Sequence, residues 1–284
     1  MKVLIVRNQS NPAASDATFS LSAYLTDQGY QVDAIKADQI ADISSRLDLR
    51  ERLEGSYDLT VVLGGDGTII RTASLLHDQN APILGINFGH LGFLANDSDE
   101  GVVSLVSRAL AGDLHSSRRS CLDVIVEQEG VREEQHFFAV NEACISRGAA
   151  GRTLGYRFGI SDVPMARLTG DGLIVATATG STAYSLAAGG PLVTPGFTGM
   201  VVQPLAPHTL TARAVLADAN DVVDIVFDRP EDRVAATLFI DGDAAPVEGP
   251  IASVRVQRSS DAITFLYVHA DHFLTYSASM FFGL

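Results

Sequence analysis

The sequence predicts an α/β domain with a parallel sheet over residues 1–115, followed by a β-rich, antiparallel and sandwich-like domain over residues 116–264. The first prediction rests on short apolar runs that alternate with stretches of helical periodicity, a pattern typical of parallel strands joined by right-handed crossovers. The second rests on apolar side chains that alternate with polar ones between turn residues. Residues 265–284 are rich in aromatic and apolar side chains, so we expect this C-terminal tail to dock on the first domain.

Apolar runs and a helix-stop residue define the expected elements of the first domain. The run Val3–Val6 is typical of a buried strand, and the amphipathic stretch after it predicts a helix. Gly112 directly follows the last helical stretch, where glycine commonly ends a helix. The expected strands are Val3–Val6, Gln31–Ile35, Leu59–Leu63 and Pro82–Ile86, and the expected helices are Ser15–Gln28, Thr68–Leu76 and Glu100–Ala111.

In the second domain, alternation and turn residues predict short strands. Leu122, Val124 and Val126 alternate with other side chains, and Glu129-Gly130 after them is typical of a hairpin turn. The stretch Asp228–Asp232 is expected to be another turn. Further strands are expected at Phe137–Ile145, Leu173–Thr177, Val222–Phe227 and Val234–Ile240.

Composition excludes several classes of protein. The chain has 284 residues, of which 46% are hydrophobic, enough for a substantial core. Its 20 basic and 34 acidic residues give a net charge of −14, so neither nucleic acid nor an anionic membrane is an expected partner. No apolar run of about eighteen residues predicts a membrane span. The two cysteines, Cys121 and Cys144, are expected to be reduced in a cytoplasmic protein.

The strongest chemical signal is the run Gly64-Gly65-Asp66-Gly67-Thr68, between an expected strand and an expected helix. Glycines let the backbone approach a ligand closely, and the helix N-terminus favours an anion. Asp66 would repel a phosphate unless it binds a metal or accepts a proton. The alternative is that Asp66 only caps the helix. The run matches neither the Rossmann dinucleotide fingerprint nor the Walker P-loop.

Three further segments are candidates for the same chemistry. The glycine-rich stretch Gly85–Leu94 follows the next strand, and it either completes a ligand crevice or forms a tight turn with Phe88 and Phe93 in the core. Asn141 and Glu142 interrupt an apolar strand and offer donors and acceptors suited to a ribose diol. A hydroxyl-rich run within Gly170–Pro191 leads into a short helix and would suit a purine nucleoside, although an ordinary cap explains Ser181 alone.

These motifs, in their order and spacing over about residues 1–250, closely resemble those of NAD kinases. The resemblance is carried by Gly64–Thr68, Asn141-Glu142 and Gly170–Pro191. It implies transfer of a phosphoryl group from ATP, or another donor, to the adenosine ribose 2′-hydroxyl of NAD, which gives NADP. Because the chain has only two lysines, we expect a divalent cation, Mg²⁺, to help neutralise the transferring phosphoryl group, and we expect a homo-oligomer, either dimer or tetramer. The resemblance leaves the metal ligands unassigned.

The resemblance also implies roles for individual residues. Asp66 corresponds to the proton acceptor, and Asn141 and Glu142 correspond to ribose and adenine-side contacts. Three positions depart from the family pattern: Ala178 replaces a proline, Thr169 a basic residue, and Asp243 a glutamine found in some members. The other positions that correspond to nucleotide contacts are Gly64, Gly65, Gly67, Thr68, Arg152, Asp171, Thr182, Ala183, Tyr184, Ser185, Leu186 and Ala187.

Two other functions are compatible with parts of this pattern. Gly64–Thr68 alone is shared with diacylglycerol and sphingosine kinases, but a lipid kinase is expected to have a basic or apolar surface toward the membrane, which the charge of −14 disfavours. A non-catalytic NAD or NADP sensor would retain the binding motifs. Such a sensor gains little from a carboxylate such as Asp66 beside a phosphate, so the sequence favours an enzyme.

Overall fold

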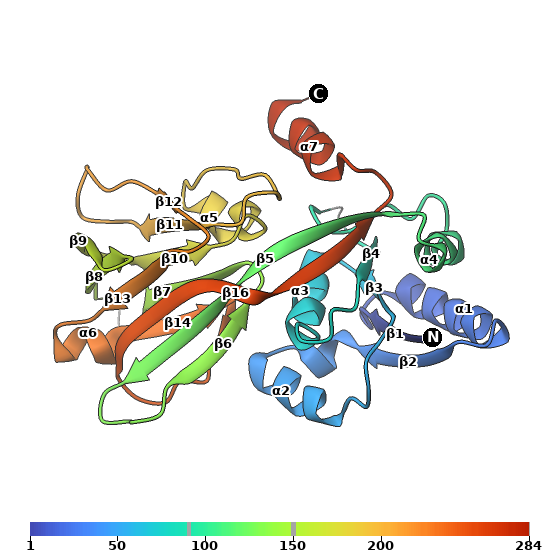
Figure 1. The fold of residues 1–284 in the computed structure, drawn as a ribbon, viewed down its shortest axis with the longest axis horizontal. Helices are drawn as coiled ribbons and strands as arrows, with labels where there is room; N and C mark the ends of the chain where they lie inside the picture. Colours follow the sequence, from blue (N-terminus) through green and yellow to red (C-terminus); the bar gives the residue numbers. More distant parts are fainter. Residues whose placement is uncertain (90–91, 149–151, 284) are drawn as a thin grey trace. The chain divides into compact units, whose positions relative to one another are not determined.

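Two segments of the chain, Met1–Arg119 and Ala262–Leu284, form the first structural unit, and Ser120–Asp261 forms the second (Figure 1). The computed structural model describes all residues except 90–91, 149–151 and 284. The long strands β5 (His115–Gln128) and β16 (Ile251–Tyr267) each contribute residues to both units. The C-terminal tail therefore belongs to the unit that contains the N-terminus.

Unit 1 has a parallel sheet in the order β2-β1-β3-β4, and the end of β16 pairs with β4 through Phe265 and Ile83. Every residue of β3 is buried, which is typical of a central parallel strand. The elements of this unit are β1 (Lys2–Arg7), α1 (Pro12–Asp27), β2 (Gln31–Lys36), the 3₁₀ helix η1 (Ala37–Ile40), α2 (Ile43–Arg52), β3 (Leu59–Gly64), α3 (Asp66–Leu75), β4 (Ile83–Asn87), α4 (Val102–Ala111), α7 (His272–Ser277) and the π-helix η3 (Ala278–Phe282).

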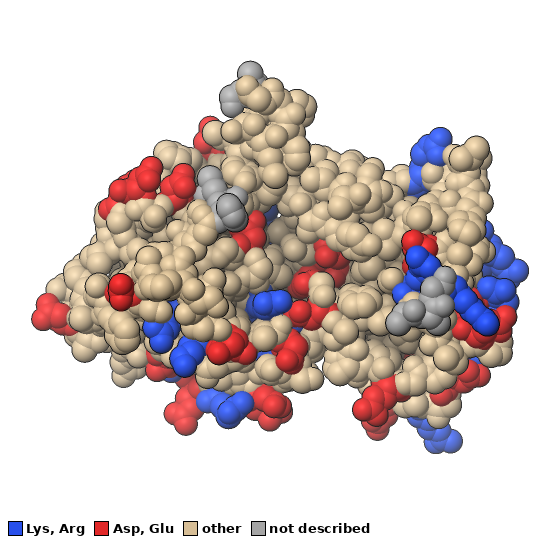
Figure 2. Space-filling model, turned by 180° about the vertical axis from the view of Figure 1, so that it is seen from behind, with Lys and Arg blue, Asp and Glu red and all other residues tan. Residues whose placement is uncertain are grey.

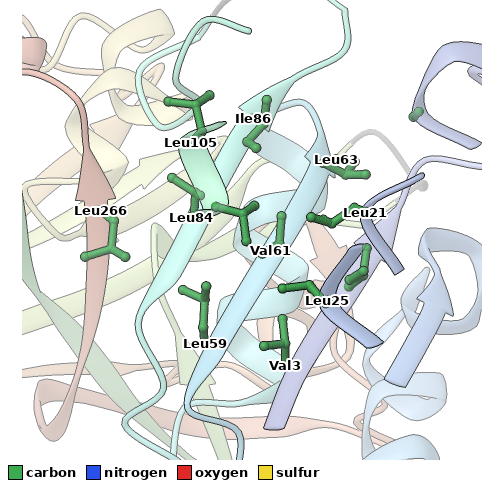
Figure 3. Packing of buried hydrophobic residues seen from close by; sticks show 13 residues of the cluster. Val3, Leu21, Leu25, Leu59, Val61, Leu63, Leu84, Ile86, Leu105 and Leu266 are labelled. Atoms are coloured by element: carbon green, nitrogen blue, oxygen red, sulfur yellow. The ribbon is translucent and has the colours of Figure 1, made fainter. Parts of the chain in front are cut away.

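A cluster of aliphatic side chains holds one face of this sheet against α1 and α4 (Figure 3). Leu21 and Leu25 of α1 pack with Val3, Val61 and other residues of the central strands, and all of these are shielded from solvent. Burial of each such side chain stabilises the fold by about 1.5–3 kcal/mol. The cluster thereby fixes the carboxyl ends of β3 and β4, where the glycine-rich segments begin.

Unit 2 is antiparallel. One sheet has the order β12-β11-β10-β7-β14-β15. In the other set of strands, β16 pairs with β13, β13 with β8, and β8 with β9, while β5 pairs with β6. Its elements are β6 (Gln135–Ala139), β7 (Glu142–Arg147), β8 (Leu154–Ile160), β9 (Val163–Gly170), β10 (Gly172–Ala176), the 3₁₀ helix η2 (Gly180–Thr182), α5 (Tyr184–Ala187), β11 (Met200–Leu205), β12 (Val215–Ala217), β13 (Val222–Val226), α6 (Pro230–Ala235), β14 (Ala236–Ile240) and β15 (Asp243–Ala244). The predicted fold class, parallel α/β followed by antiparallel β, is confirmed.

Several local predictions were wrong. Helix α1 begins at Pro12 rather than Ser15, because the Asn11 side chain caps it by accepting the amides of Ala13 and Ala14 at 2.9 and 3.3 Å. Part of the expected turn Asp228–Asp232 belongs to helix α6, which also includes Val234. The expected strand Phe137–Ile145 is two strands, because β6 ends at Ala139 and β7 begins at Glu142.

Other elements were absent from the prediction. Helix α2 has few apolar residues, and the β8–β9 hairpin turns through Ser161 and Asp162, which have positive φ angles without a glycine. Within the described part of the chain, no helix has the length and apolar character needed to cross a membrane. On the face drawn in Figure 2, acidic and basic side chains are interspersed.

Candidate functional site

The expected site residues fall into two groups, one in each unit, and each group is described by itself. Unit 1 contains the glycine-rich turn with Asp66 and the second glycine-rich stretch, Gly85–Leu94. Unit 2 contains the Asn141-Glu142 pair and the segment Gly170–Pro191.

The first glycine-rich turn joins the buried strand β3 to helix α3. Gly65 is the N-cap residue, and its carbonyl accepts hydrogen bonds from the amides of Thr68 and Ile69 at 3.0 and 3.2 Å. A Cβ added at Gly65 or at Gly67 would meet no atom within 4 Å, so open space adjoins the backbone at both positions. The turn therefore exposes the positive end of α3 to a ligand, as expected of an anion site.

Asp66 does not cap its own helix, so the capping alternative is wrong. Its Oδ2 accepts the backbone N–H of Phe93 at 2.8 Å, and its Oδ1 accepts that of Leu94 at 3.2 Å. Burial raises the pKa of the Asp66 carboxyl above its usual range, and the hydrogen bonds from the backbone of Phe93, Leu94 and Ala95 act in the opposite direction. The result is a carboxylate of increased basicity whose orientation is fixed by a loop 27 residues further along the chain.

Gly92 explains how this loop comes so close to the carboxylate. A Cβ at position 92 would overlap both oxygens of Asp66, so only glycine is compatible with the contact. Gly85 has a similar function under α3, since a Cβ there would overlap the side chain of Ile69. Phe88 is partly buried and Phe93 is 8% exposed, as the tight-turn alternative for this stretch predicts. His90 and Leu91 of the stretch lie outside the described residues.

Asn96 was not recognised in the sequence, although it fixes the loop that binds Asp66. This residue is 2% exposed, and its side-chain amide donates to the carbonyls of Gly85 at 3.0 Å and Leu266 at 2.9 Å. Its Oδ1 accepts the amide of Val268 at 2.9 Å. Because two of these partners lie 170 or more residues away in sequence, no local pattern indicates this role.

In unit 2, the Asp241 carboxylate holds the backbone at the break between β6 and β7. It accepts the amides of Val140 at 2.9 Å, Asn141 at 2.6 Å and Glu142 at 3.1 Å. Asp241 itself has a positive φ of 51° in the hairpin between β14 and β15. Three donors on one carboxylate fix the peptide of Asn141 and Glu142, so the break in the strand is a specific structure.

The segment after β10 also holds the backbone of Val140 and Asn141. The amide of Thr177 donates to the Asn141 carbonyl at 2.8 Å, and the Thr177 hydroxyl donates to the Val140 carbonyl at 2.7 Å. A Cβ at Gly180 would overlap the Asn141 carbonyl. The structure therefore brings Asn141 together with Thr177 and Gly180, which the sequence presented as separate motifs.

Glu142 has an environment that favours its protonated form. The residue is 5% exposed, and its Oε2 has no hydrogen-bond partner among the described residues. Burial, together with the charge of Asp241, raises the pKa of Glu142 to about 8. At neutral pH the side chain is thus predominantly a neutral carboxylic acid that can donate a hydrogen bond.

The residues expected to bind adenine have different environments. Tyr184 is 48% exposed, whereas the Ser185 hydroxyl is buried without a partner in the described structure. Thr182 donates to the Thr179 carbonyl at 3.0 Å. The Ser181 hydroxyl donates to the Ala178 carbonyl at 2.7 Å, a structural contact. Ala183 and Leu186 are partly buried, and Ala187 is exposed.

Asp171 and Arg152, two further residues expected at the site, have different surroundings. Asp171 forms an ion pair with Arg147, whose Nε lies 2.8 Å from Asp171 Oδ1. Arg152 is exposed in the segment before β8. Arg147 was not singled out in the sequence, because a lone arginine at the end of an apolar strand has no distinctive pattern.

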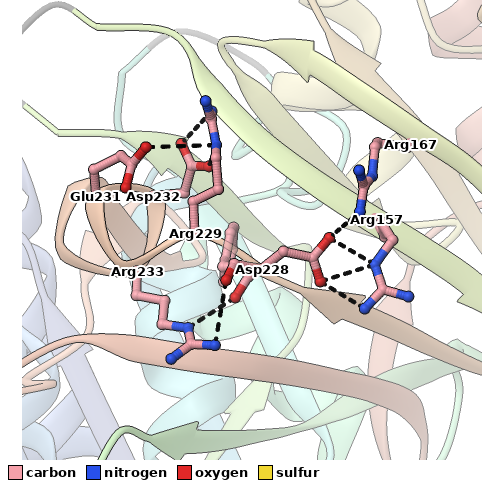
Figure 4. Close-up of polar contacts among 8 residues, drawn as sticks. Arg157, Arg167, Asp228, Arg229, Glu231, Asp232 and Arg233 are labelled. Carbon is pink, nitrogen blue, oxygen red and sulfur yellow. Dashed lines mark hydrogen bonds and ion pairs between the residues drawn. The ribbon is translucent and has the colours of Figure 1, made fainter.

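A separate group of ion pairs lies at α6 and the β8–β9 hairpin (Figure 4). Asp228 binds Arg157, with a shortest distance of 2.6 Å, and also contacts Arg167 at 2.5 Å. Arg229 pairs with Asp232, which is 3% exposed, at 2.6 Å. Since a carboxylate partners each of these arginines, we assign the group a structural role.

Family models match most of the chain. The ATP-NAD kinase N-terminal domain matches residues 3–114, and the ATP-NAD kinase C-terminal domain matches residues 140–268. An NAD kinase of Dehalococcoides mccartyi is 31% identical over 272 residues, which is 96% of this chain and 92% of that protein. An NAD kinase of Chlorobium phaeovibrioides is 32% identical over 268 residues, covering 94% and 92% of the two chains.

Solved structures share the fold. A yeast NADH kinase complexed with NADH superimposes with a TM-score of 0.84 at 20% identity, covering 100% of this chain and 88% of that chain. An NAD kinase from Archaeoglobus fulgidus in complex with ATP gives a TM-score of 0.74 at 21% identity, with coverage of 100% and 98%. The similarity thus extends over both units of the chain.

The raised pKa of Glu142 predicts a specific dependence of stability on pH. An acid with a pKa of about 8 when folded and near 4.5 when unfolded makes the protein lose stability as pH rises between these values. Glu142→Gln removes this loss, so the variant gains stability relative to the parent by up to about 1.4 kcal/mol per pH unit over that interval.

Urea unfolding at pH 5, 6, 7 and 8 measures this difference, with Glu133→Gln at an exposed position as the control. A difference in unfolding free energy between Glu142→Gln and the parent that stays constant with pH would show that Glu142 is ionised throughout.

Proposed function

The chain belongs to the NAD kinase family and is an enzyme that phosphorylates NAD, and we propose that Asp66 is the proton acceptor of this reaction. The observation that carries the proposal is the Asp66 carboxylate, which is partly buried at the start of α3 and held by the amides of Phe93 and Leu94. A secondary hydroxyl is a weak nucleophile, and a positioned carboxylate accelerates its reaction by accepting its proton.

The proposed step transfers the terminal phosphoryl group of ATP to the 2′-hydroxyl of the adenosine ribose. The hydroxyl oxygen forms a bond to phosphorus while the bond from phosphorus to the ADP oxygen breaks, and the hydroxyl proton passes to Asp66. NADP and ADP are the products. The raised pKa of Asp66 favours its function as a base, because a more basic carboxylate takes the proton more readily.

We assign the nucleotide contacts to both units. In unit 1, we propose that a phosphate binds at the N-terminus of α3, in the turn formed by Gly64, Gly65, Gly67 and Thr68. In unit 2, Asn141 and the neutral Glu142 supply hydrogen bonds to the ribose and the adenine side of NAD. The further contacts we propose are Arg152, Asp171, Thr182, Ala183, Tyr184, Ser185, Leu186 and Ala187.

A divalent cation is proposed to enter with the phosphoryl donor as its Mg²⁺ complex. Among the described residues, no group of three or more His, Cys, Asp and Glu side chains is arranged to hold a metal ion. The Asp66 oxygens already accept backbone amides, a donor set that suits a base better than a metal ligand. Phosphate oxygens and water are therefore the expected ligands of Mg²⁺.

We further propose a cytoplasmic homo-oligomer, either dimer or tetramer. Cys121 and Cys144 are both buried and are not joined in a disulfide, which is compatible with a reducing compartment. Large apolar side chains such as Leu210, Leu216 and Phe282 are more than half exposed, which is compatible with contacts between subunits. Light scattering on the purified chain tests the oligomeric state.

Asp66→Asn is expected to lower kcat by about 10²–10⁴-fold, because an amide does not accept the proton. NAD affinity is expected to change far less, since the residues of unit 2 are intact. The amide nitrogen also faces a backbone N–H that it cannot bind, so the variant is expected to lose about 1–3 kcal/mol of stability.

Steady-state kinetics, NAD titration and thermal unfolding separate these effects. Asp42→Asn is the matched control, because Asp42 accepts the amide of Ser45 at 2.8 Å at the N-cap of α2, where asparagine caps about equally well. Near-parental kcat for Asp66→Asn would remove Asp66 from the mechanism, and an equal collapse of binding and rate would indicate a structural role.

Asn141→Ala and Tyr184→Ala are each expected to weaken NAD binding. Loss of a buried hydrogen bond costs about 1–3 kcal/mol, which corresponds to roughly 5- to 150-fold in affinity. The contacts that hold Asn141 in place are made by its backbone, so truncation of the side chain leaves the local structure intact. Calorimetric titration with NAD is the measurement, and Asn220→Ala in an exposed turn is the control. Parental affinity in both variants would mean that the dinucleotide binds elsewhere.

Turnover is expected to require a divalent cation. The chain is strongly acidic and has only two lysines, Lys2 and Lys36, so the charge of the transferring phosphoryl group needs another source of neutralisation. NADP formation is measured with ATP and NAD in excess chelator, and then after Mg²⁺ is restored. Full activity in the chelator contradicts the requirement.

A further inference from the structure

The aromatic C-terminal tail lies against the loop that holds Asp66. The Phe93 ring contacts three rings of the tail: Tyr276 edge-on at 4.7 Å between centroids, Phe273 at 5.7 Å, and Phe281 stacked at 6.1 Å. Phe93 and Phe273 are each 8% exposed. All four residues belong to unit 1, although the tail is separated from Phe93 by the whole of unit 2 in sequence.

The His272 ring of the tail lies near the backbone of Phe93. The pKa of His272 is lowered mainly by burial and by the charge of Arg119, while the nearby Phe93 backbone acts in the opposite direction. The His272 ring stacks on Tyr267 at 4.6 Å between centroids, and Arg119 donates to the Tyr267 hydroxyl at 3.0 Å. Buried Arg119 thus anchors the start of the tail through Tyr267, and the aromatic rings further along the tail pack on Phe93.

Phe93 is the residue whose amide donates to Asp66 Oδ2 at 2.8 Å. A shift of its backbone therefore changes the orientation of the carboxylate. We propose that the segment His272–Phe281 positions the catalytic base Asp66 through its contacts with Phe93, and that Tyr276 and His272 are the main positioning residues. This inference rests on the proposed role of Asp66.

The energetics favour a positioning role over a purely structural one. Aromatic pairs of this kind stabilise each other beyond the effect of burial, so the three ring contacts restrict Phe93 more than a single contact would. Misplacement of a catalytic group by about 1 Å lowers the reaction rate by up to 10²-fold. Loss of one contact near the surface changes the free energy of unfolding only a little. Tyr276 is only partly buried, so its truncation does not empty the core.

Tyr276→Ala tests the inference, with Tyr276→Phe as the conservative variant that keeps the ring. Phe282→Ala is the matched control, because Phe282 lies in η3, which directly follows α7 in the tail, but is 71% exposed. We expect Tyr276→Ala to lower kcat by about 10- to 100-fold with KM values for NAD and ATP within about two-fold of the parent. Tyr276→Phe and Phe282→Ala are expected to retain near-parental kcat. A His272→Ala variant provides a second, independent test.

A double-variant cycle with Asp66→Asn distinguishes positioning from structure. If the tail acts through Asp66, Tyr276→Ala reduces kcat in the parent but adds little in the Asp66→Asn background. A full multiplicative loss in the double variant, or near-parental kcat in both Tyr276→Ala and His272→Ala, overturns the inference. Near-parental kcat in Asp66→Asn itself overturns the proposed base, so the two failures are distinguishable.

Discussion

Each of the two groups of site residues contains one aspartate whose carboxylate accepts hydrogen bonds from the backbone amides of a segment far away in the sequence. In unit 1 the loop after β4 binds Asp66, and in unit 2 the break between β6 and β7 binds Asp241. An amide donor stabilises the charged form of a partly buried carboxylate without a cationic partner. This is an effective arrangement in a chain that has only two lysines. Other residues of each group bring the amides within hydrogen-bond distance of the carboxylate.

Glycines make this close approach of two segments possible. Gly92 lies directly on Asp66, and Gly180 lies directly on the Asn141 carbonyl, where any side chain would overlap its neighbour. Their function is to leave space, which differs from the function of the glycines at the N-terminus of α3, beside which there is room for a ligand. Asn96 then fixes the loop by joining β4 to the end of β16. Precise placement of a functional group therefore depends on neighbours with no chemical role of their own.

The sequence predicted the fold class and the family, because strand periodicity and glycine-rich turns are local signals. It did not predict the residue pairs that hold the motifs, such as Asp66 with Phe93 or Asp241 with Asn141, which lie 27 and 100 positions apart. The strand break at Asn141 was also missed, since the apolar run from Phe137 to Ile145 resembles one continuous strand. Tertiary hydrogen bonds to a carboxylate overrode the local pattern there.

Asp66 and Glu142 show how environment gives different properties to two acidic side chains. Both are removed from water to some extent, which raises the pKa of each. Asp66 receives backbone amides that favour its ionised form, so it suits the acceptance of a proton. Glu142 has the charge of Asp241 nearby and an oxygen without a partner, so the neutral acid is favoured. In the nucleotide contact that we propose for Glu142, a neutral donor beside an anionic dinucleotide avoids the repulsion that a carboxylate would cause.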